Sequence, residues 1–168
     1  MVRRTSQIYA VAICIFVVAW CPFAAIADVV GAARTVDGDT LDVAGFRVDL
    51  WGIDAPERDQ RCWYNKGGDW ACGQAARRAL ANFIEGGEVI CIEKARRPSG
   101  RILGVCSVLG TEIELNEAMD LLGLAISDQR DTRNYAGAEG YAKGALRGMW
   151  SGRFVPPAHW RRMYRHRM

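Results

Sequence analysis

Residues 29–53 read VVGAARTVDGDTLDVAGFRVDLWGI, and this stretch decides the fold. It is rich in valine, and two dipeptides, Asp37-Gly38 and Ala44-Gly45, divide it into three apolar segments. Dipeptides of this kind between strand-like segments are typical of tight hairpin turns. The stretch therefore predicts three antiparallel strands in a meander.

The segments that follow narrow the fold class. Residues 54–72 predict a long loop, and GQAARRALANFIEG (73–86) predicts a helix, because its apolar residues share one face and glycine ends it. EVICIE (88–93) and RILGVCSV (101–108) flank the turn ARRPSG and predict a hairpin. Five short strands with a helix between the third and fourth favour an α+β, mainly β fold, built on a five-stranded OB-fold barrel.

Two further helical stretches bring the expected number of helices to about three. TEIELNEAMDLLGLA (111–125) predicts a short strand and then a helix capped by Asn116. Asp131 to Met149 also has helical spacing of its apolar residues, although its glycines weaken that interpretation.

The first 27 residues have the pattern of a secretory signal peptide. Arg3 and Arg4 precede a long apolar run, which ends in the small-x-small sequence Ala25-Ile26-Ala27. An uncleaved signal anchor is the alternative, because the apolar run is only slightly shorter than a membrane span. We expect an exported chain, periplasmic or secreted, that starts at Asp28 and is not inserted in a membrane after cleavage.

Length and charge predict one domain with a basic tail. The 168 residues are 50% hydrophobic and 24% charged, which indicates a globular domain over residues 28–152. The formal net charge of +3 does not by itself indicate a nucleic-acid binder. Residues 153–168 contain five arginines and no acid. We expect a solvated tail there in preference to a contact with phosphates or an anionic surface.

Four cysteines follow the expected cleavage site, and an even number in an exported chain indicates two disulfides. Metal binding is the rival interpretation, but no CxxC pair exists and both histidines lie in the tail. If Lys94 faces Leu103 in the hairpin, Cys91 faces Cys106 directly, at a spacing that a disulfide can bridge. Cys62 and Cys72 would then close the intervening loop.

Acidic residues gather in the first turn and after the third strand. If barrel closure brings these two places together, Asp39 and Asp54 could share a hard cation such as Ca²⁺ through oxygen ligands. Glu57 would then be free to act as a base on a water molecule. On the residues alone, a surface role is favoured, because aspartate in turns and glutamate after proline are common.

Five motifs change that balance, because together they resemble the family of staphylococcal nuclease, the thermonucleases. The motifs come in the family's order and at its approximate spacing, across about residues 29–150. They are V-D-G-D-T-L (36–41), G-I-D-A-P-E (52–57), G-R-I-L-G (100–104), L-N-E-A-M (115–119) and Gly-Met-Trp (148–150). The extra cysteines and the tail resemble an exported bacterial branch.

The resemblance implies Ca²⁺-dependent cleavage of DNA or RNA by an OB-fold nuclease, leaving 3′-phosphate products. The Ca²⁺ ligands would be the carboxylates of Asp39 and Asp54 and the backbone carbonyl of Ala55. Glu57 matches the general base and Arg101 a phosphate-binding arginine. Asp37 matches the outer carboxylate of the turn. We expect a monomer with a DNA or RNA substrate, and the sequence does not decide between the two.

Position 49 departs from the family pattern. The family usually has an arginine five residues before the aspartate of D-x-P-E, and here that residue is Asp49. Arg47 shares the same strand face and is the candidate substitute, at a distance of roughly 6–7 Å along the strand. Asp49 could instead join the metal site, or pair with Arg47 or Arg58.

Tyrosines are also missing. Ser99 and Gln129-Arg130-Asp131 stand where the family has nucleotide-binding tyrosines. Stacking on Trp51, Trp63, Tyr64 or Trp70 could compensate, although packing is the more ordinary role of such residues. The alternative function is therefore a catalytically weakened nuclease-like OB module, which binds nucleic acid or polysaccharide at the cell envelope.

Overall fold

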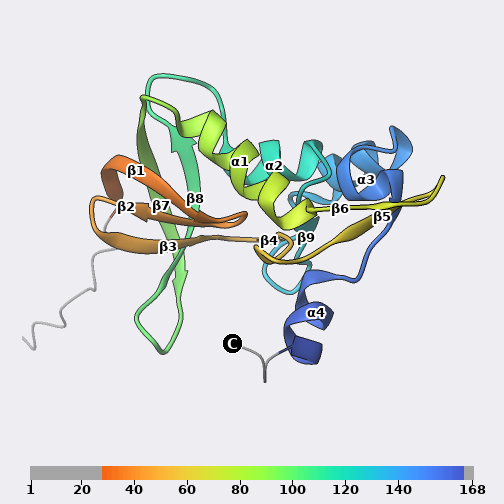
Figure 1. Cartoon of the computed structure of the whole chain (residues 1–168). Coiled ribbons are helices and arrows are strands. Elements are labelled where there is room, and N and C mark those ends of the chain that lie inside the picture. The colour runs from red at the N-terminus through yellow and green to blue at the C-terminus, as the bar shows by residue number, and fades with distance from the viewer. Residues whose placement is uncertain (1–27, 165–168) are drawn as a thin grey trace, which may run out of the picture.

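Five strands form a closed barrel in the computed structural model, which describes residues 28–164 (Figure 1). Around the barrel the order is β1-β2-β3-β8-β7, and all neighbours are antiparallel except β3 and β8. The barrel strands are β1 (Val29–Asp37), β2 (Thr40–Val43), β3 (Phe46–Leu50), β7 (Glu88–Arg96) and β8 (Ile102–Val108). The OB-type barrel and the three-stranded meander are therefore confirmed.

The turn between β2 and β3 shows why the meander forms. Ala44 and Gly45 have φ angles of 50° and 87°. Two consecutive positive φ values characterise the type I′ turn, whose twist matches that of the strands it joins. The register that follows pairs Val43 with Phe46 and Leu41 with Val48.

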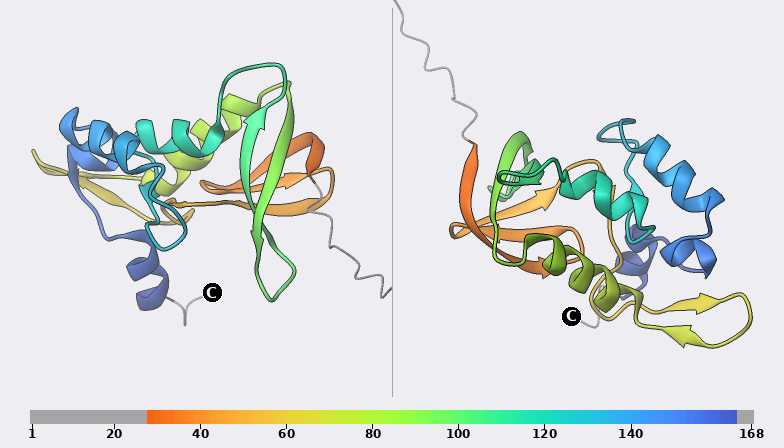
Figure 2. Two further views of the ribbon diagram at one scale, coloured as in Figure 1. Left: turned by 180° about the vertical axis from the view of Figure 1, so that it is seen from behind. Right: turned by 90° about the horizontal axis from the view of Figure 1, so that it is seen from above.

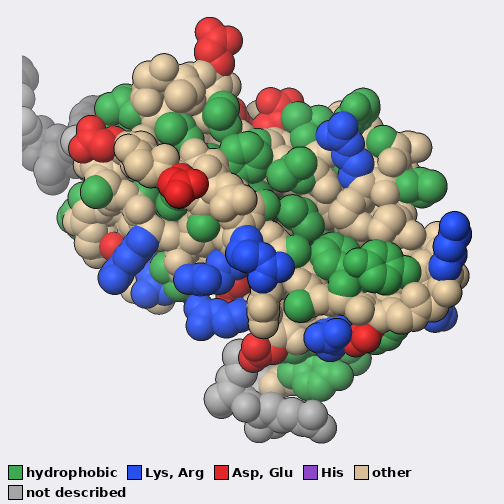
Figure 3. All heavy atoms as spheres, turned by 45° about the horizontal axis from the view of Figure 1, so that its top comes forward, with side chains coloured by type: hydrophobic (Ala, Val, Ile, Leu, Met, Phe, Trp, Pro, Cys, Tyr) green, Lys and Arg blue, Asp and Glu red, His purple; other side chains and the backbone are tan. Residues whose placement is uncertain are grey.

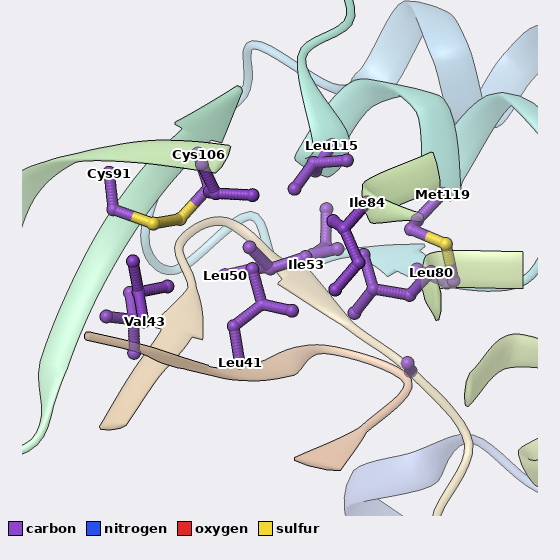
Figure 4. Close-up of a cluster of buried hydrophobic side chains, with 14 of the residues drawn as sticks. Leu41, Val43, Leu50, Ile53, Leu80, Ile84, Cys91, Cys106, Leu115 and Met119 are labelled. Atoms are coloured by element: carbon purple, nitrogen blue, oxygen red, sulfur yellow. A yellow bond between two sulfur atoms is a disulfide. The ribbon is translucent and has the colours of Figure 1, made fainter. Parts of the chain in front are cut away.

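The barrel interior is filled by the inward residues of the meander and the later hairpin (Figure 4). Leu41, Val43 and Val48 are completely buried, as are Val89 and Cys106. Each apolar side chain of this size contributes about 1.5–3 kcal/mol when it is removed from water. The apolar segments read from the sequence thus supply the barrel's part of the core.

Two helices cover this core at one end of the barrel, and two more lie beyond them (Figures 1 and 2). Leu80 and Ile84 from the first helix, and Leu115 and Met119 from the second, complete the buried cluster. The helices are α1 (Cys72–Ile84), α2 (Leu115–Leu121), α3 (Ala136–Gly144) and α4 (Pro157–Tyr164), with a 3₁₀ turn η1 (Gly148–Ser151). α4 lies in the segment for which we expected a solvated tail.

Three expectations about local structure are wrong. Asn116 does not cap α2; Glu114 holds that position, and the buried Asn116 amide instead bonds to backbone groups of Trp51, Gly104 and Cys106. The strand expected before α2 is reduced to a single bridge between Ser107 and Glu114. The helical stretch from 131 to 149 is interrupted after Gly144, because Leu146 adopts a φ of 51°.

Both disulfides join the expected cysteines. Cys91 and Cys106 are paired residues of β7 and β8, with Cα atoms 4.0 Å apart. The register premise behind this pairing was wrong in one respect. A bulge between Glu93 and Ala95 places Ala95, not Lys94, opposite Leu103. The bulge lies beyond the cysteines, so their alignment is unaffected.

The other disulfide anchors a small sheet outside the barrel. Cys62 and Cys72 have Cα atoms 5.7 Å apart and join this sheet to the start of α1. The sheet has the order β10-β5-β6, and β5 and β6 extend away from the barrel (Figure 1). Its strands are β5 (Cys62–Tyr64), β6 (Asp69–Trp70) and β10 (Gly152–Arg153). The chain therefore returns to this sheet immediately before α4.

The described part of the chain contains no helix that is long and apolar enough to cross a membrane. The expected signal peptide, residues 1–27, lies outside the described residues.

Candidate active site

The turn between β1 and β2 packs directly against the D-A-P-E segment. Leu50 N donates to the Asp39 carbonyl at 2.8 Å, and Ala55 N donates to Asp39 Oδ2 at 3.0 Å. A Cβ atom on Gly38 would lie 2.9 Å from the Ala55 Cβ and 2.8 Å from the Ala76 Cβ, so the approach requires glycine. Barrel closure thus brings the first turn to the end of the third strand.

The carboxylates of this region destabilise one another's charged forms. Burial, together with the charges of Asp54, Asp37 and Glu57, raises the pKa of Asp39 to about 7, although the Ala55 N–H lowers it. Burial raises the pKa of Glu57 also, and Arg161 partly offsets that shift. Clustered acids of this kind gain stability from a nearby positive charge.

The backbone around Glu57 is fixed by the loop that follows it. Gln60 N donates to the Glu57 carbonyl at 2.8 Å, and Glu57 N donates to the Gln60 side chain at 3.3 Å. The start of α1 presses on the same place, because a Cβ on Gly73 would lie 1.7 Å from the Glu57 oxygen. Asp54 is held by β4 (Ile53–Asp54), which pairs with β9 (Ile126–Ser127). Asp54 and Glu57 therefore occupy defined positions.

Asp49 forms ion pairs with two arginines of the turn between β7 and β8. Its carboxylate accepts from Arg101 Nη2 at 2.5 Å, from Arg97 Nε at 3.2 Å and from Thr40 Oγ1 at 3.2 Å. The expected pairing with Arg47 or Arg58 is wrong, since Arg58 donates instead to the Val36 carbonyl. Asp49 therefore neutralises Arg101, the residue that resembles the family's phosphate-binding arginine.

The C-terminal helix contributes a residue that the sequence did not indicate. Arg161 Nη1 donates to Asp54 Oδ1 and to Glu57 Oε1, both at 2.7 Å, and Nη2 donates to Asp54 Oδ2 at 3.0 Å. The arginine-rich, acid-free composition of this segment was the available signal, and it did not single out one arginine.

These residues line a cleft of about 500 Å³. Its acids include Asp37, Asp39, Asp49, Asp54 and Glu57, and its arginines are Arg47, Arg97, Arg101, Arg130 and Arg161. All the residues predicted for catalysis, phosphate binding or metal binding line this cleft except Ala55, whose backbone N–H donates to Asp39. None of the four candidate stacking aromatics is among the described residues that line it; Trp51 lines a second, smaller pocket.

The donors present fit a hard cation. Two carboxylates and a carbonyl, at Asp39, Asp54 and Ala55, are oxygen ligands of the kind that Ca²⁺ takes, with water completing the shell. The raised pKa of Asp39 agrees with a site that gains from a cation. Within residues 28–164, no three His, Cys, Asp or Glu side chains form a group that could hold a metal ion unaided. The fit thus depends on the carbonyl and on water.

Positively charged side chains also form a group on the protein surface. Figure 3 shows Lys and Arg side chains in a group on one part of the face, with hydrophobic side chains spread over much of the rest. The formal net charge of +3 does not reveal such an arrangement.

Comparison with known proteins places most of the chain in one family. The family described as "Staphylococcal nuclease homologue" matches residues 47–152, a range that contains Asp54, Glu57 and Arg101. The succinoglycan biosynthesis protein ExoI of Rhizobium meliloti (strain 1021) is 34% identical over 124 residues, which are 73% of this chain and 64% of that protein. The protein ParB of Escherichia coli is 34% identical over 146 residues, which are 77% of this chain and 76% of ParB.

Proposed function

We propose, from the premise that the chain belongs to the family of staphylococcal nuclease homologues, that it hydrolyses phosphodiester bonds of DNA or RNA with Ca²⁺. The observation that carries this proposal is the hydrogen bond between Ala55 N and Asp39 Oδ2, 3.0 Å long. It joins the two acidic turns, so that two ligand carboxylates and a base share one cleft. The chain spans 64% of the first relative and 76% of the second, and neither relative's name states a nuclease activity.

Each residue of the cleft has a distinct chemical task. Asp39, Asp54 and the Ala55 carbonyl would hold the cation, which when bound would supply Lewis-acid stabilisation of the negative charge on the phosphate. Glu57 accepts a proton from the attacking water. Burial raises its pKa, and a carboxylate with a raised pKa is a stronger base than an ordinary one. Cleavage leaves a 3′-phosphate and a 5′-hydroxyl.

Phosphate binding falls to the arginines on the other side of the cleft. Arg101 is 44% exposed at its side chain and can turn toward a phosphate if it leaves Asp49. Arg47 also lines the cleft and adds positive charge on β3. Guanidinium groups suit this task because they bind phosphate oxygens through two parallel hydrogen bonds.

The test compares cleavage of a labelled single-stranded DNA by the wild type and Glu57→Gln, with Ca²⁺ and with chelator. We expect cleavage by the wild type in Ca²⁺ alone, and a loss of at least about 100-fold in Glu57→Gln, because general-base catalysis contributes about 10²–10⁴-fold. Glu112→Gln, at an exposed position, is the matched control and keeps the wild-type rate. Equal rates for all three proteins would contradict the role of Glu57.

The pairing of Asp49 with Arg101 and Arg97 favours a second candidate function. A cleft whose arginines are internally neutralised binds the transition state weakly, which suits a module that mainly binds nucleic acid or polysaccharide. DNA binding without cleavage, unchanged by chelator, would favour this function over hydrolysis.

Export is part of the proposal. The two disulfides are typical of an oxidising environment, as found in the periplasm or outside the cell. We infer a signal peptide at 1–27, a monomeric nuclease domain at 28–152 and a basic C-terminal segment at 153–168. N-terminal sequencing of the exported protein is expected to start at Asp28; an intact N-terminus at Met1 would contradict cleavage.

A further inference from the structure

Arg161 occupies the two acidic groups that the proposed reaction needs. Both oxygens of Asp54 and one oxygen of Glu57 accept hydrogen bonds from its guanidinium, at 2.7–3.0 Å. The Arg161 side chain is 38% exposed, whereas those of Asp54 and Glu57 are only 10% and 22% exposed. The guanidinium therefore covers these carboxylates from the solvent side.

The segment that carries Arg161 is fixed by contacts independent of this ion pair. β10 pairs with β5, and a Cβ on Gly152 would lie 1.8 Å from the Trp63 oxygen. The completely buried Gln60 donates from Nε2 to the Val155 carbonyl at 2.6 Å. Phe154 packs on the cluster formed by the Cys62–Cys72 disulfide and Met149.

These anchors place α4 over the cleft. The Gln60 side chain accepts from Glu57 N and donates to the Val155 carbonyl. One buried side chain therefore connects the loop that carries Glu57 to the residues just before α4. Pro157, the first residue of α4, is buried. The position of Arg161 is therefore set by the contacts of its segment with the loop that the Cys62–Cys72 disulfide closes. The ion pair with Asp54 and Glu57 is not what holds this segment in place.

We propose that Arg161 is a built-in competitor of the divalent cation: it holds Asp54 and Glu57 in the unloaded protein, and the cation must displace it. This inference rests on the proposed function, because it concerns regulation of the same site. Both oxygens of Asp54 accept from the guanidinium, at 2.7 Å and 3.0 Å, so its positive charge repels a cation that approaches the same carboxylate. Arg161 also holds one oxygen of Glu57, Oε1, so the guanidinium compensates the charge of the proposed general base as well.

The site thereby has two states, which differ in the cation that compensates the clustered acids. In one, the guanidinium compensates the clustered acids; in the other, the divalent cation does so and Arg161 turns away. Charge-assisted hydrogen bonds to a guanidinium are among the stronger ones in proteins, so the exchange lowers the apparent affinity for the cation.

The test is Ca²⁺ binding measured by isothermal titration calorimetry, which does not depend on activity. Arg161→Gln removes the competing charge, and we expect Ca²⁺ to bind about tenfold more tightly, since one charge-assisted hydrogen bond is worth about that factor. Arg161→Lys keeps the charge without the bidentate geometry, and we expect an intermediate affinity. Arg162→Gln, the exposed next residue of α4, controls for the loss of one positive charge and stays within about twofold of the wild type.

Each other outcome separates the two proposals. Equal Ca²⁺ affinity of the wild type, Arg161→Gln and Arg162→Gln would overturn competition while leaving the cation site intact. Weaker binding by Arg161→Gln would mean that Arg161 supports the site, which also overturns competition. If no variant binds Ca²⁺, the proposed function fails, and the competition proposal fails with it. Thermal melting of each variant confirms that the protein is folded before titration.

Discussion

Replacing Asp49 by asparagine tests whether this aspartate restrains the cleft arginines. The side chain of Asp49 is 13% exposed and accepts from Arg97, Arg101 and Thr40. Asparagine has the same shape but no charge, so Thr40 can keep its hydrogen bond while both arginines lose their ion pair. Arg97 and Arg101 are 52% and 44% exposed, and water can solvate them once they are released.

The structure sets the scale of the two expected effects. Ion pairs as exposed as these contribute about 0–1 kcal/mol each, so Asp49→Asn is expected to lose up to about 2 kcal/mol of unfolding free energy. In a chain of this length that is a decrease in Tm of up to roughly 6 °C. A released arginine can donate to a phosphate, and one such charge-assisted bond is worth about tenfold in DNA affinity.

The assay combines thermal melting with steady-state cleavage of single-stranded DNA in Ca²⁺. We expect Asp49→Asn to melt lower than the wild type and yet to have a KM about tenfold lower, in proportion to one charge-assisted bond. Asp42→Asn is the matched control, because Asp42 pairs with Arg34 on the neighbouring strand and does not line the cleft. That control should lose a little stability and keep the wild-type KM.

Two results would refute the reasoning about Asp49. An unchanged or higher KM in Asp49→Asn would show that Arg97 and Arg101 do not bind the substrate phosphate when released. A loss of Ca²⁺ affinity would show instead that Asp49 belongs to the cation site.

Further predictions concern stability. Burial raises the pKa of Asp120 to about 7, so the folded state favours the protonated acid, and this group lowers stability progressively as the pH rises from about 4 to about 7. Asp120→Asn should remove that dependence and add up to about 4 kcal/mol of unfolding free energy at pH 8, as measured by urea denaturation at several pH values; an unchanged pH profile would contradict it. Replacing Cys62 and Cys72 by alanine should cost about 2–4 kcal/mol of unfolding free energy in the same assay. A thiol titration of the non-reduced exported protein should find none of its four cysteines free, and two free thiols would contradict the pairing.

The barrel could be predicted from the sequence because its determinants are local. The valine-rich segments, the Ala44-Gly45 turn and the facing positions of Cys91 and Cys106 each involve residues close in the chain or in one hairpin. The bulge at Glu93–Ala95 could not be predicted from the sequence pattern. The predicted pairing of Cys91 with Cys106 was still correct, because the bulge lies beyond the cysteines. Asn116 misled because asparagine is a frequent cap, whereas here its amide satisfies three backbone groups in the core.

The acids of the site and Arg101 were accessible through their motifs, whereas Arg161 and the ion pairs of Asp49 were not. The contact of Asp39 with Ala55 follows from barrel closure, which the motif order suggested. Arg161 binds Asp54 and Glu57, which precede it by 107 and 104 residues in the sequence. Hydrophobic periodicity does not predict contacts between residues so far apart in the chain. The pairing of Asp49 with Arg97 and Arg101 likewise depends on parallel β3–β8 packing, which brings the 97–101 turn to β3.

The rate of DNA cleavage as a function of Ca²⁺ concentration tests the central claim most directly, when the ends of the products are identified in the same samples. We expect a saturable rise in rate with Ca²⁺, none with chelator, and fragments that carry 3′-phosphates. DNA that is bound but stays intact at every Ca²⁺ concentration, or is cut equally with chelator, would contradict a Ca²⁺-dependent nuclease at this cleft.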